Sequence, residues 1–400
     1  MRYLDEISLD ETKLPKLPKF GLILFVFTIF NSLKFSFLLN VNEYLIFGFL
    51  SFALLIFLLS TQKYFSVTDK SRVFILLFFL GILTATRGNL NAYIALILRV
   101  LPLMFFVLLK DEYKLRVLYS FDKVLSIIIA ISLIAWILML VGVPLPHIPL
   151  RWNSYMFHNY FFFLKIHDIF SFSVFPRFQC IFYEPGYFGC LCVIMIYLRG
   201  YLFKNWQSIV YLIALVLTYS LAGYLLFFIG LLVYVLKNKK GRIGYIFVLI
   251  SLALVFFKLL NSDDGNAIYS MFAYRLEFED GEMSGYNRTT DVFETWWRTY
   301  FLKHGNWLFG DNELINRFAG HSDVGVDLRV FIARFGIVPL LFYFGSMIYY
   351  YRCEKSNLGL YFLLLFVIYY YRGYTVMFFI GFQMLYIAGL CLFNKKTHNK

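Results

Sequence analysis

The sequence predicts an all-α polytopic membrane protein of about twelve transmembrane helices, organised as a single integral membrane domain over residues 1–400. Three observations lead to this fold class. Hydrophobic residues make up 60% of the chain and charged residues only 15%, which is too little polar surface for a water-soluble globule of 400 residues. Apolar runs recur from end to end. Half of the acidic residues, 12 of 24, lie in one polar stretch, 261–328.

Roughly 15 to 20 apolar residues form a helix long enough to cross a hydrocarbon core of about 30 Å. We expect such helices near residues 20–39, 43–60, 73–86, 90–109, 121–142, 180–198, 207–219, 221–236, 243–260, 329–350, 357–371 and 374–393. The run 207–236 is too long for one helix and short for two, so it is interpreted as a tight hairpin that turns at Ser220, Ala222 and Gly223. This hairpin sets the side of the membrane for every later segment.

Lys and Arg are unevenly distributed over the segments between these helices. With the N terminus in the cytoplasm, the cytoplasmic segments are short and hold about 21 of the 37 basic residues, as the positive-inside rule requires. Both termini then face the cytoplasm, and the long segments 143–179 and 261–328 are extracytoplasmic. The second segment has five basic and 12 acidic residues, a net −7, so the rest of the chain carries +20. This topology accounts for the positive charge without a nucleic-acid partner.

The segment 143–179 differs from the polar loop. Between residues 151 and 175 it interleaves aromatic residues with His158, Lys165, His167 and Asp168, which suits a helix lying in the membrane interface. Such a helix is either a connector along the membrane surface or a lid over a lipid-borne substrate.

No cofactor or metal is expected. None of the five cysteines lies in the polar loop, and neither the cysteines nor the histidines have metal-ligand spacing. The two halves of the chain do not repeat one another, which weighs against transporter folds built from inverted repeats.

The first candidate site lies where the sixth expected helix begins on its outer side. Arg177 is followed by Tyr183, Glu184, Pro185 and then Gly189. An ionisable group at membrane depth is functional by default. The alternative is that Glu184 simply occupies the favourable N-terminal end of a helix dipole. Nearby in the expected topology, the hydroxyls of the hairpin tip, Ser220 among them, either line a substrate or satisfy freed backbone groups.

The second candidate site lies in the polar loop and just after it. Several Arg side chains around a His suit a phosphorylated substrate, because guanidinium forks bind phosphate oxygens and His takes up a proton near neutral pH. A solvated cap held by salt bridges is the alternative. The residues are Arg288, Trp297 on an amphipathic helix that runs to about Leu302, His321, Asp323, and then Arg329 and Arg334. Arg99, inside a span, pairs with either a carboxylate or a phosphate.

These motifs, in this order, resemble the Wzy-type polysaccharide polymerases and the related O-antigen ligases. The resemblance covers residues 177–345, about half of the chain. It is carried by the Glu-Pro-x-x-x-Gly of 184–189, Thr218-x-Ser220, Arg288 ahead of a Trp-bearing helix and a Leu-Phe-Gly310 turn, His321-Ser-Asp323, and Phe335-Gly336-Ile337.

The resemblance implies a metal-independent glycosyltransferase of the bacterial inner membrane. It would move a growing glycan from undecaprenyl pyrophosphate to a lipid-linked repeat unit on the extracytoplasmic face, in O-antigen, capsule or exopolysaccharide synthesis. Arg177 and Arg288, with Arg329 and Arg334 at the membrane edge, would hold the pyrophosphate, and His321 or Glu184 would activate the acceptor hydroxyl. Tyr183, Ser220, Trp297 and Asp323 would line the substrate. A chain-length regulator and a flippase are the expected protein partners.

The chain departs from the family pattern at two places. Leu221 stands where an Arg commonly follows the hairpin Ser, and no Gly-x-x-Gly follows His321 with the spacing of the ligases. The second difference favours a polymerase over a ligase that transfers glycan to lipid A core. A lipid-linked oligosaccharide flippase and a structural partner in a synthase complex are the remaining alternatives.

Overall fold

The computed structural model describes residues 3–4, 14–38, 41–86, 90–152, 155–166, 176–201, 203, 205–237, 278–279, 282–283, 290–311, 328–354, 356–372 and 380–394. The chain forms two compact units, which are described separately. The first comprises Met1–Leu33, Val41–Phe121 and Asn287–Lys400, and the second comprises Lys34–Asn40 and Asp122–Tyr286. Helix α6 (Asp111–Leu140) contributes residues to both units.

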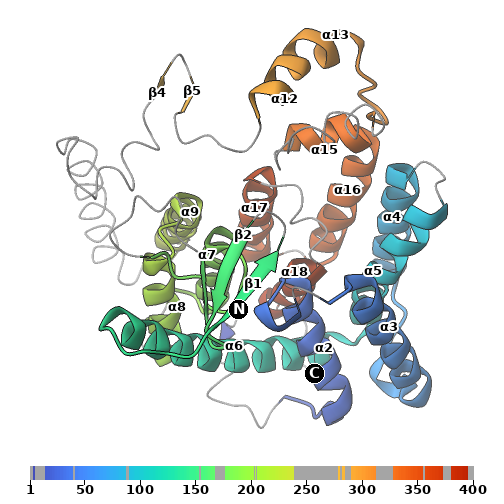
Figure 1. The fold of residues 1–400 in the computed structure, drawn as a ribbon. Helices are drawn as coiled ribbons and strands as arrows, with labels where there is room; N and C mark the ends of the chain where they lie inside the picture. The colour runs from blue at the N-terminus through green and yellow to red at the C-terminus, as the bar shows by residue number, and fades with distance from the viewer. Residues whose placement is uncertain are drawn as a thin grey trace. The chain divides into compact units, whose positions relative to one another are not determined.

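The first unit is a set of apolar helices around α18 (Ile380–Phe393), whose side chains are all buried. Helix α18 contacts α2 (Lys19–Ser32), α5 (Leu90–Leu108) and α17 (Asn357–Arg372), and α3 (Glu43–Ser60) packs along α5. Helix α16 (Ile337–Glu354) runs beside α4 (Asp69–Thr86), as Figure 1 shows. The remaining described elements of this unit are η3 (Gln62–Tyr64), α12 (Asp291–Trp296), the π-helix η5 (Trp297–Phe301), α13 (Leu302–His304) and α15 (Leu328–Phe335).

The second unit is built around α7 (Pro185–Leu198), which is apolar on every face and wholly buried. It packs against α8 (Trp206–Leu217) and α9 (Leu221–Lys237). The other elements are η2 (Ser36–Leu38), β1 (Ile148–Trp152), β2 (Tyr155–Asn159), β3 (Leu164–Ile166), β4 (Phe278–Glu279) and β5 (Glu282–Met283). Helices α8 and α9 are the two arms of the expected hairpin over 207–236. Its turn lies at 218–220, so Ser220 is in the turn as expected, whereas Ala222 and Gly223 belong to the first turn of α9.

The helices are compatible with a membrane protein. Among the described residues, α3, α5 and α6 are long and apolar enough to cross a bilayer, and a fourth span results if α15 and α16 count as one. The total of about twelve spans stays a prediction, and the span expected near 243–260 lies outside the described residues. Arg99 of α5 pairs with a carboxylate, that of Glu43 on α3, at 3.5 Å.

The expected interfacial helix in 151–175 is wrong over the part that is described. Strands β1, β2 and β3 form an antiparallel sheet in the order β1-β2-β3, and the green arrows of Figure 1 mark β1 and β2. The fold is therefore mostly helical rather than all-α. Side chains alternate with a period of two residues: Leu150 and Phe157 lie opposite each other on the buried face, and Arg151 points to the other face opposite Met156. The strands are only three to five residues long, and the aromatic run 160–163 in the turn between β2 and β3 hides this alternation in the sequence.

The helix expected over 329–350 is also wrong as a continuous span. It breaks at Gly336 into α15 and α16, which are bent by 118°. Gly336 has φ +86°, and a Cβ at this position would lie 2.1 Å from the carbonyl oxygen of Leu308. The turn 307–310 fills the break, because the backbone N–H groups of Ile337 and Val338 donate to the carbonyls of Trp307 and Leu308. The first N–H groups of α16 have no acceptor within the helix, and the carbonyls of this turn supply one for each of these two.

We expect Gly336→Ala to destabilise the protein by more than about 2 kcal/mol, because the backbone conformation disfavours any Cβ and the nearest atoms belong to rigid backbone. The measurement is the midpoint of thermal unfolding in detergent. Gly345→Ala on α16 is the matched control, since nothing lies within 4 Å of its added Cβ, and it should leave the midpoint unchanged or raise it. Equal effects of the two substitutions would refute the importance of the break.

Candidate functional site

Glu184 stands at the entrance to α7 in the second unit. It is the N-cap residue, with extended backbone (φ −132°, ψ 124°), and Pro185 follows at the first helical position, where its missing N–H loses no bond. The Glu184 side chain does not cap the helix by a hydrogen bond and is half-buried. Its position at the positive end of the helix dipole is favourable in itself. The carboxylate is therefore held at a helix entrance without serving as a cap.

Arg177 lies against the tip of the α8–α9 hairpin. Its Nε donates to the carbonyl oxygen of Thr218 at 2.8 Å, and the neighbouring N–H of Phe178 donates to the carbonyl of Leu217 at 2.9 Å. Both acceptors belong to the C-terminal end of α8, whose last carbonyls have no partner within the helix. The two bonds fix the half-exposed guanidinium of Arg177 beside this turn.

The hairpin tip also contacts α7 directly. A Cβ added at Gly189 would lie 3.1 Å from Oγ1 of Thr218 and 3.2 Å from Cβ of Ser220, so the glycine allows close packing. Ser220 is 1% exposed, and its Oγ accepts a hydrogen bond from the N–H of Gly223 in the first turn of α9. This geometry favours the packing role of Ser220 over substrate lining. The two motifs 177–189 and 218–220, 29 residues apart in the sequence, nevertheless form one structural feature.

Tyr183 connects this feature to the three-stranded sheet. It packs, together with Ile166, against the buried cluster of Leu150, Phe157 and Leu164. The N–H of Leu164 donates to the carbonyl of Cys180 at 2.8 Å, which ties β3 to the turn before α7. The sheet thereby holds the residue next to Glu184 in place.

In the first unit, Trp297 lies in an aromatic cluster. The expected amphipathic helix is confirmed as α12, the π-helix and α13, and Thr290 caps its start by accepting from the N–H of Phe293. Trp297 is 7% exposed, stacks on Phe301 at 4.7 Å between ring centroids and meets Trp307 edge-on at 5.5 Å. These contacts indicate that Trp297 supports the loop, with little of its ring left to face a substrate.

Arg329 forms a two-pronged ion pair with Glu294 of α12. Its Nη1 and Nη2 lie 2.9 and 2.6 Å from the two carboxylate oxygens. Planar guanidinium–carboxylate pairs of this kind are specific in geometry. A phosphate at Arg329 would therefore compete with Glu294, in line with the alternative of a salt-bridged cap. Arg334, on the same helix α15, contributes its backbone to the contact with Gly310.

Three predicted site residues, Arg288, His321 and Asp323, lie outside the described residues. The described candidates fall into two sets, one in each unit: Tyr183, Glu184, Arg177 and Ser220 in the second, and Trp297, Arg329 and Arg334 in the first.

The first unit contains a largely buried ionic cluster that the sequence does not predict. The ammonium group of Lys70 contacts the carboxylates of both Asp111 and Glu354, and Lys114 contacts Asp111 at 2.9 Å. Asp111 is thus paired with two ammonium groups, which offset the cost of burying its charge. The only signal in the sequence is a set of charges at the ends of apolar runs.

The same cluster contains acidic groups close enough for a metal ion. Ligand atoms of Asp111, Glu354 and Cys391 lie within 4.8 Å of one another. The two lysines already neutralise the carboxylates, so a cation would have to displace them. The arrangement is an ion-pair network that connects α4, α6 and α16.

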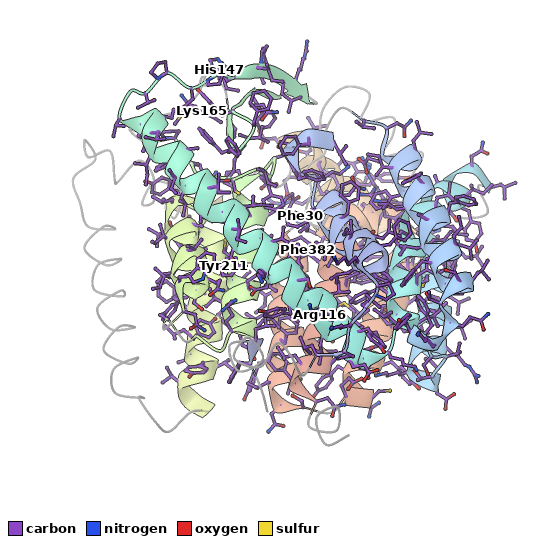
Figure 2. The ribbon with its side chains drawn as sticks, turned by 90° about the horizontal axis from the view of Figure 1, so that it is seen from below. Phe30, Arg116, His147, Lys165, Tyr211 and Phe382 are labelled. Atoms are coloured by element: carbon purple, nitrogen blue, oxygen red, sulfur yellow. The ribbon has the colours of Figure 1, made fainter. Side chains whose placement is uncertain are left out.

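The second unit contains a buried ion pair that the sequence does not predict either. Arg199 Nε donates to Asp122 Oδ1 at 3.1 Å and Nη2 contacts Oδ2, while the hydroxyl of Tyr211 donates to Oδ1 at 2.9 Å. Figure 2 labels Tyr211. Both charged side chains are 1% exposed. This buried pair joins α6, the end of α7 and α8.

No protein-family model, curated protein or solved structure matches this chain.

Proposed function

We propose that the protein is a membrane glycosyltransferase that polymerises a polysaccharide from lipid-linked repeat units. The growing glycan leaves undecaprenyl pyrophosphate and is joined to a sugar hydroxyl of a second lipid-linked unit on the extracytoplasmic face of a bacterial inner membrane. The observation that supports this proposal best is the contact of Arg177 with the hairpin tip. Two motifs of the polymerase resemblance, 177–189 and 218–220, lie in separate stretches of the sequence and are in contact.

The reaction requires the protein to stabilise the leaving group and to accept the proton of the acceptor hydroxyl. The bond between the anomeric carbon and the pyrophosphate oxygen breaks, and the acceptor oxygen forms the new bond as its proton passes to a base. Pyrophosphate is a good leaving group once its charge is held, and positioned guanidinium groups perform this task. We assign it to Arg177 and Arg288, with Arg329 and Arg334 in support.

The base has two candidates, His321 and Glu184. His takes up a proton near neutral pH, and a carboxylate does so when its surroundings raise its affinity for the proton. A pH profile of chain growth in His321→Gln and Glu184→Gln variants separates them, because the variant of the base loses the acidic limb of the profile and the other variant keeps it.

The test of the function is reconstitution. Purified protein in liposomes, supplied with an undecaprenyl-pyrophosphate-linked repeat unit, is expected to produce a ladder of longer glycans on a gel. Transfer of preformed glycan to lipid A core, without chain growth, would instead establish a ligase. Movement of the repeat unit across the bilayer, with neither reaction, would establish a flippase.

A further inference from the structure

One face of α6 carries a stripe of exposed apolar side chains. Its residues are spaced by three or four positions and therefore lie on the same side of the helix: Val124, Ile127, Ile131, Ile134 and Leu138. Helix α6 is long and apolar enough to cross a bilayer. In a bilayer, lipid chains cover such a stripe, and no specific ligand is needed.

The turn between β2 and β3 lies beside the C-terminal end of this stripe. Phe161 and Phe162 at the tip of the turn line one groove together with Ile134 and Leu138 of α6. The two phenylalanines are 42% and 54% exposed. The hydroxyl of Ser132 on α6 donates to the carbonyl oxygen of Phe162, which holds the turn at this level of the helix. The exposed rings of the turn thus continue the apolar surface of the span.

The N–H groups at the tip of the turn all have acceptors within the protein. The N–H of Tyr160 donates to the carbonyl of Phe163 at 3.0 Å, and the N–H of Phe162 donates to the carbonyl of Tyr160 at 2.8 Å. The N–H of Phe161 donates to the Asn159 side chain at 2.9 Å. A turn in water can leave such groups to the solvent, whereas a turn in hydrocarbon needs an internal partner for each of them. The bonding of this turn meets that requirement.

Phe161 is an unusual residue for its backbone conformation. Its φ of +66° lies in the left-handed region, where Gly, Asn and Asp are favoured and a bulky side chain is strained. Residues 159–164 read Asn-Tyr-Phe-Phe-Phe-Leu and include no charged side chain. In water, an exposed phenylalanine would give nothing in return for the strain. Transfer of its ring into hydrocarbon would offset it.

Polar side chains lie directly next to the aromatic tip. The ring of His147 is 5.0 Å from the ring of Tyr160, and Figure 2 shows His147 near the C-terminal end of α6. Tyrosine has an apolar ring with a polar end and is enriched at the boundary between hydrocarbon and head groups. Tyr160 therefore suits that boundary, one residue before the exposed Phe161.

We propose that the β2–β3 turn inserts into the membrane beside α6, so that Phe161 and Phe162 anchor the three-stranded sheet in the hydrocarbon of one leaflet. The partner is the lipid surface itself, because the turn continues the exposed stripe of a candidate span. The sheet is then an element embedded in the membrane rather than a domain in water. Tyr183, next to Glu184, packs against the buried cluster of this sheet, so the anchor also holds the candidate site at the membrane surface. The inference does not depend on the reaction that the protein performs.

Site-directed spin labelling measures the depth of the turn. The full-length protein, with its exposed cysteine removed by Cys353→Ser, carries one nitroxide on an introduced cysteine in phosphatidylcholine nanodiscs. Collisions of the nitroxide with oxygen, which concentrates in hydrocarbon, are compared with collisions with a water-soluble nickel chelate. The label at Phe162→Cys should favour oxygen several-fold, as should the label at Ile134→Cys on the stripe of α6. The label at Arg72→Cys, where the native side chain is 67% exposed at the start of α4, should favour the chelate.

Photolabelling of the unaltered protein gives a second measurement that needs no substitution. The nanodiscs contain a phosphatidylcholine with a diazirine at the end of one acyl chain, and labelled peptides are identified by mass spectrometry after irradiation. We expect labels in 160–163 as well as on the stripe of α6. The same labels are expected when phosphatidylglycerol replaces half of the phosphatidylcholine, because the proposed partner is hydrocarbon and not a particular head group.

Two results would overturn the inference. One is a nitroxide at Phe162→Cys that meets the nickel chelate as often as the nitroxide at Arg72→Cys does. The other is photolabelling of the α6 stripe without any label in 160–163, which would place the turn in water above the lipid. Chain growth in the reconstituted assay is a separate outcome: its absence would remove the polymerase and leave the membrane anchor in place.

Discussion

Arg177→Lys is expected to lower the rate of chain growth by about a hundredfold or more, the effect of removing one preorganised donor to a developing negative charge. Lysine keeps the positive charge, but it lacks the planar fork that bonds the Thr218 carbonyl and, in the proposed mechanism, would also bind a phosphate. The loss should therefore come from geometry rather than from charge. The measurement is the rate of glycan extension by purified protein with a lipid-linked repeat unit at saturating concentration.

The matched control is Arg72→Lys, because the Arg72 side chain is 67% exposed at the start of α4 and pairs locally with Asp69. It should extend glycan at the normal rate. A structural role for Arg177 would lower the thermal midpoint together with the rate. Normal chain growth in Arg177→Lys, with protein correctly inserted, would count against pyrophosphate binding by this residue.

Arg288→Ala is expected to abolish polymer in cells and leave single repeat units on the surface, provided that the protein is still inserted. The resemblance assigns Arg288 to the same leaving group as Arg177, so loss of either should halt the same step. The glycan pattern on a gel, with protein level checked by blotting, decides the matter. A normal distribution of chain lengths would contradict the assignment.

The second large effect concerns stability. Asp122→Ala should destabilise the protein by about 3–5 kcal/mol, because it leaves the guanidinium of Arg199 buried without its carboxylate. The hydroxyl of Tyr211 loses its acceptor on the same side chain. Thermal unfolding in one detergent, followed by the intrinsic fluorescence of the tryptophans, measures the change.

The double variant Asp122→Ala with Arg199→Met separates the two contributions. Removing both charges leaves no buried ion, so most of the lost stability should return. Lys123→Ala changes the adjacent, exposed charge and should have little effect. If the double variant were as unstable as the sum of its single variants, the buried pair would not be the source of the effect.

Local signals in the sequence predict much of the second unit. Pro185 after Glu184 marks the start of α7, and the apolar run 207–236 predicts a hairpin because it has the wrong length for one helix. Each of these predictions depends on residues that are neighbours in the chain. The contact between Arg177 and Thr218 is different, since it joins residues 41 positions apart.

Aromatic residues limit the prediction for 143–166. A strand is identified by alternation between apolar and polar residues, and here the alternation is confined to strands of three to five residues, with the aromatic run 160–163 in the turn between β2 and β3. Only the pairing of β1, β2 and β3 separates the face of Leu150 and Phe157 from the face of Arg151 and Lys165.

The sequence by itself determined that this protein is mostly helical, rich in apolar spans and polar in a few places, because composition and periodicity are local and additive. The tertiary structure decided which of the polar residues have partners. Arg329 binds Glu294, and Arg199 binds Asp122. Helix α15 ends before Gly336 because the backbone of the turn 307–310 packs directly against this glycine. These outcomes depend on residues that come into contact only after folding. Burial then gives a high free-energy cost to any unpaired charge and to any backbone N–H or C=O group without a hydrogen bond.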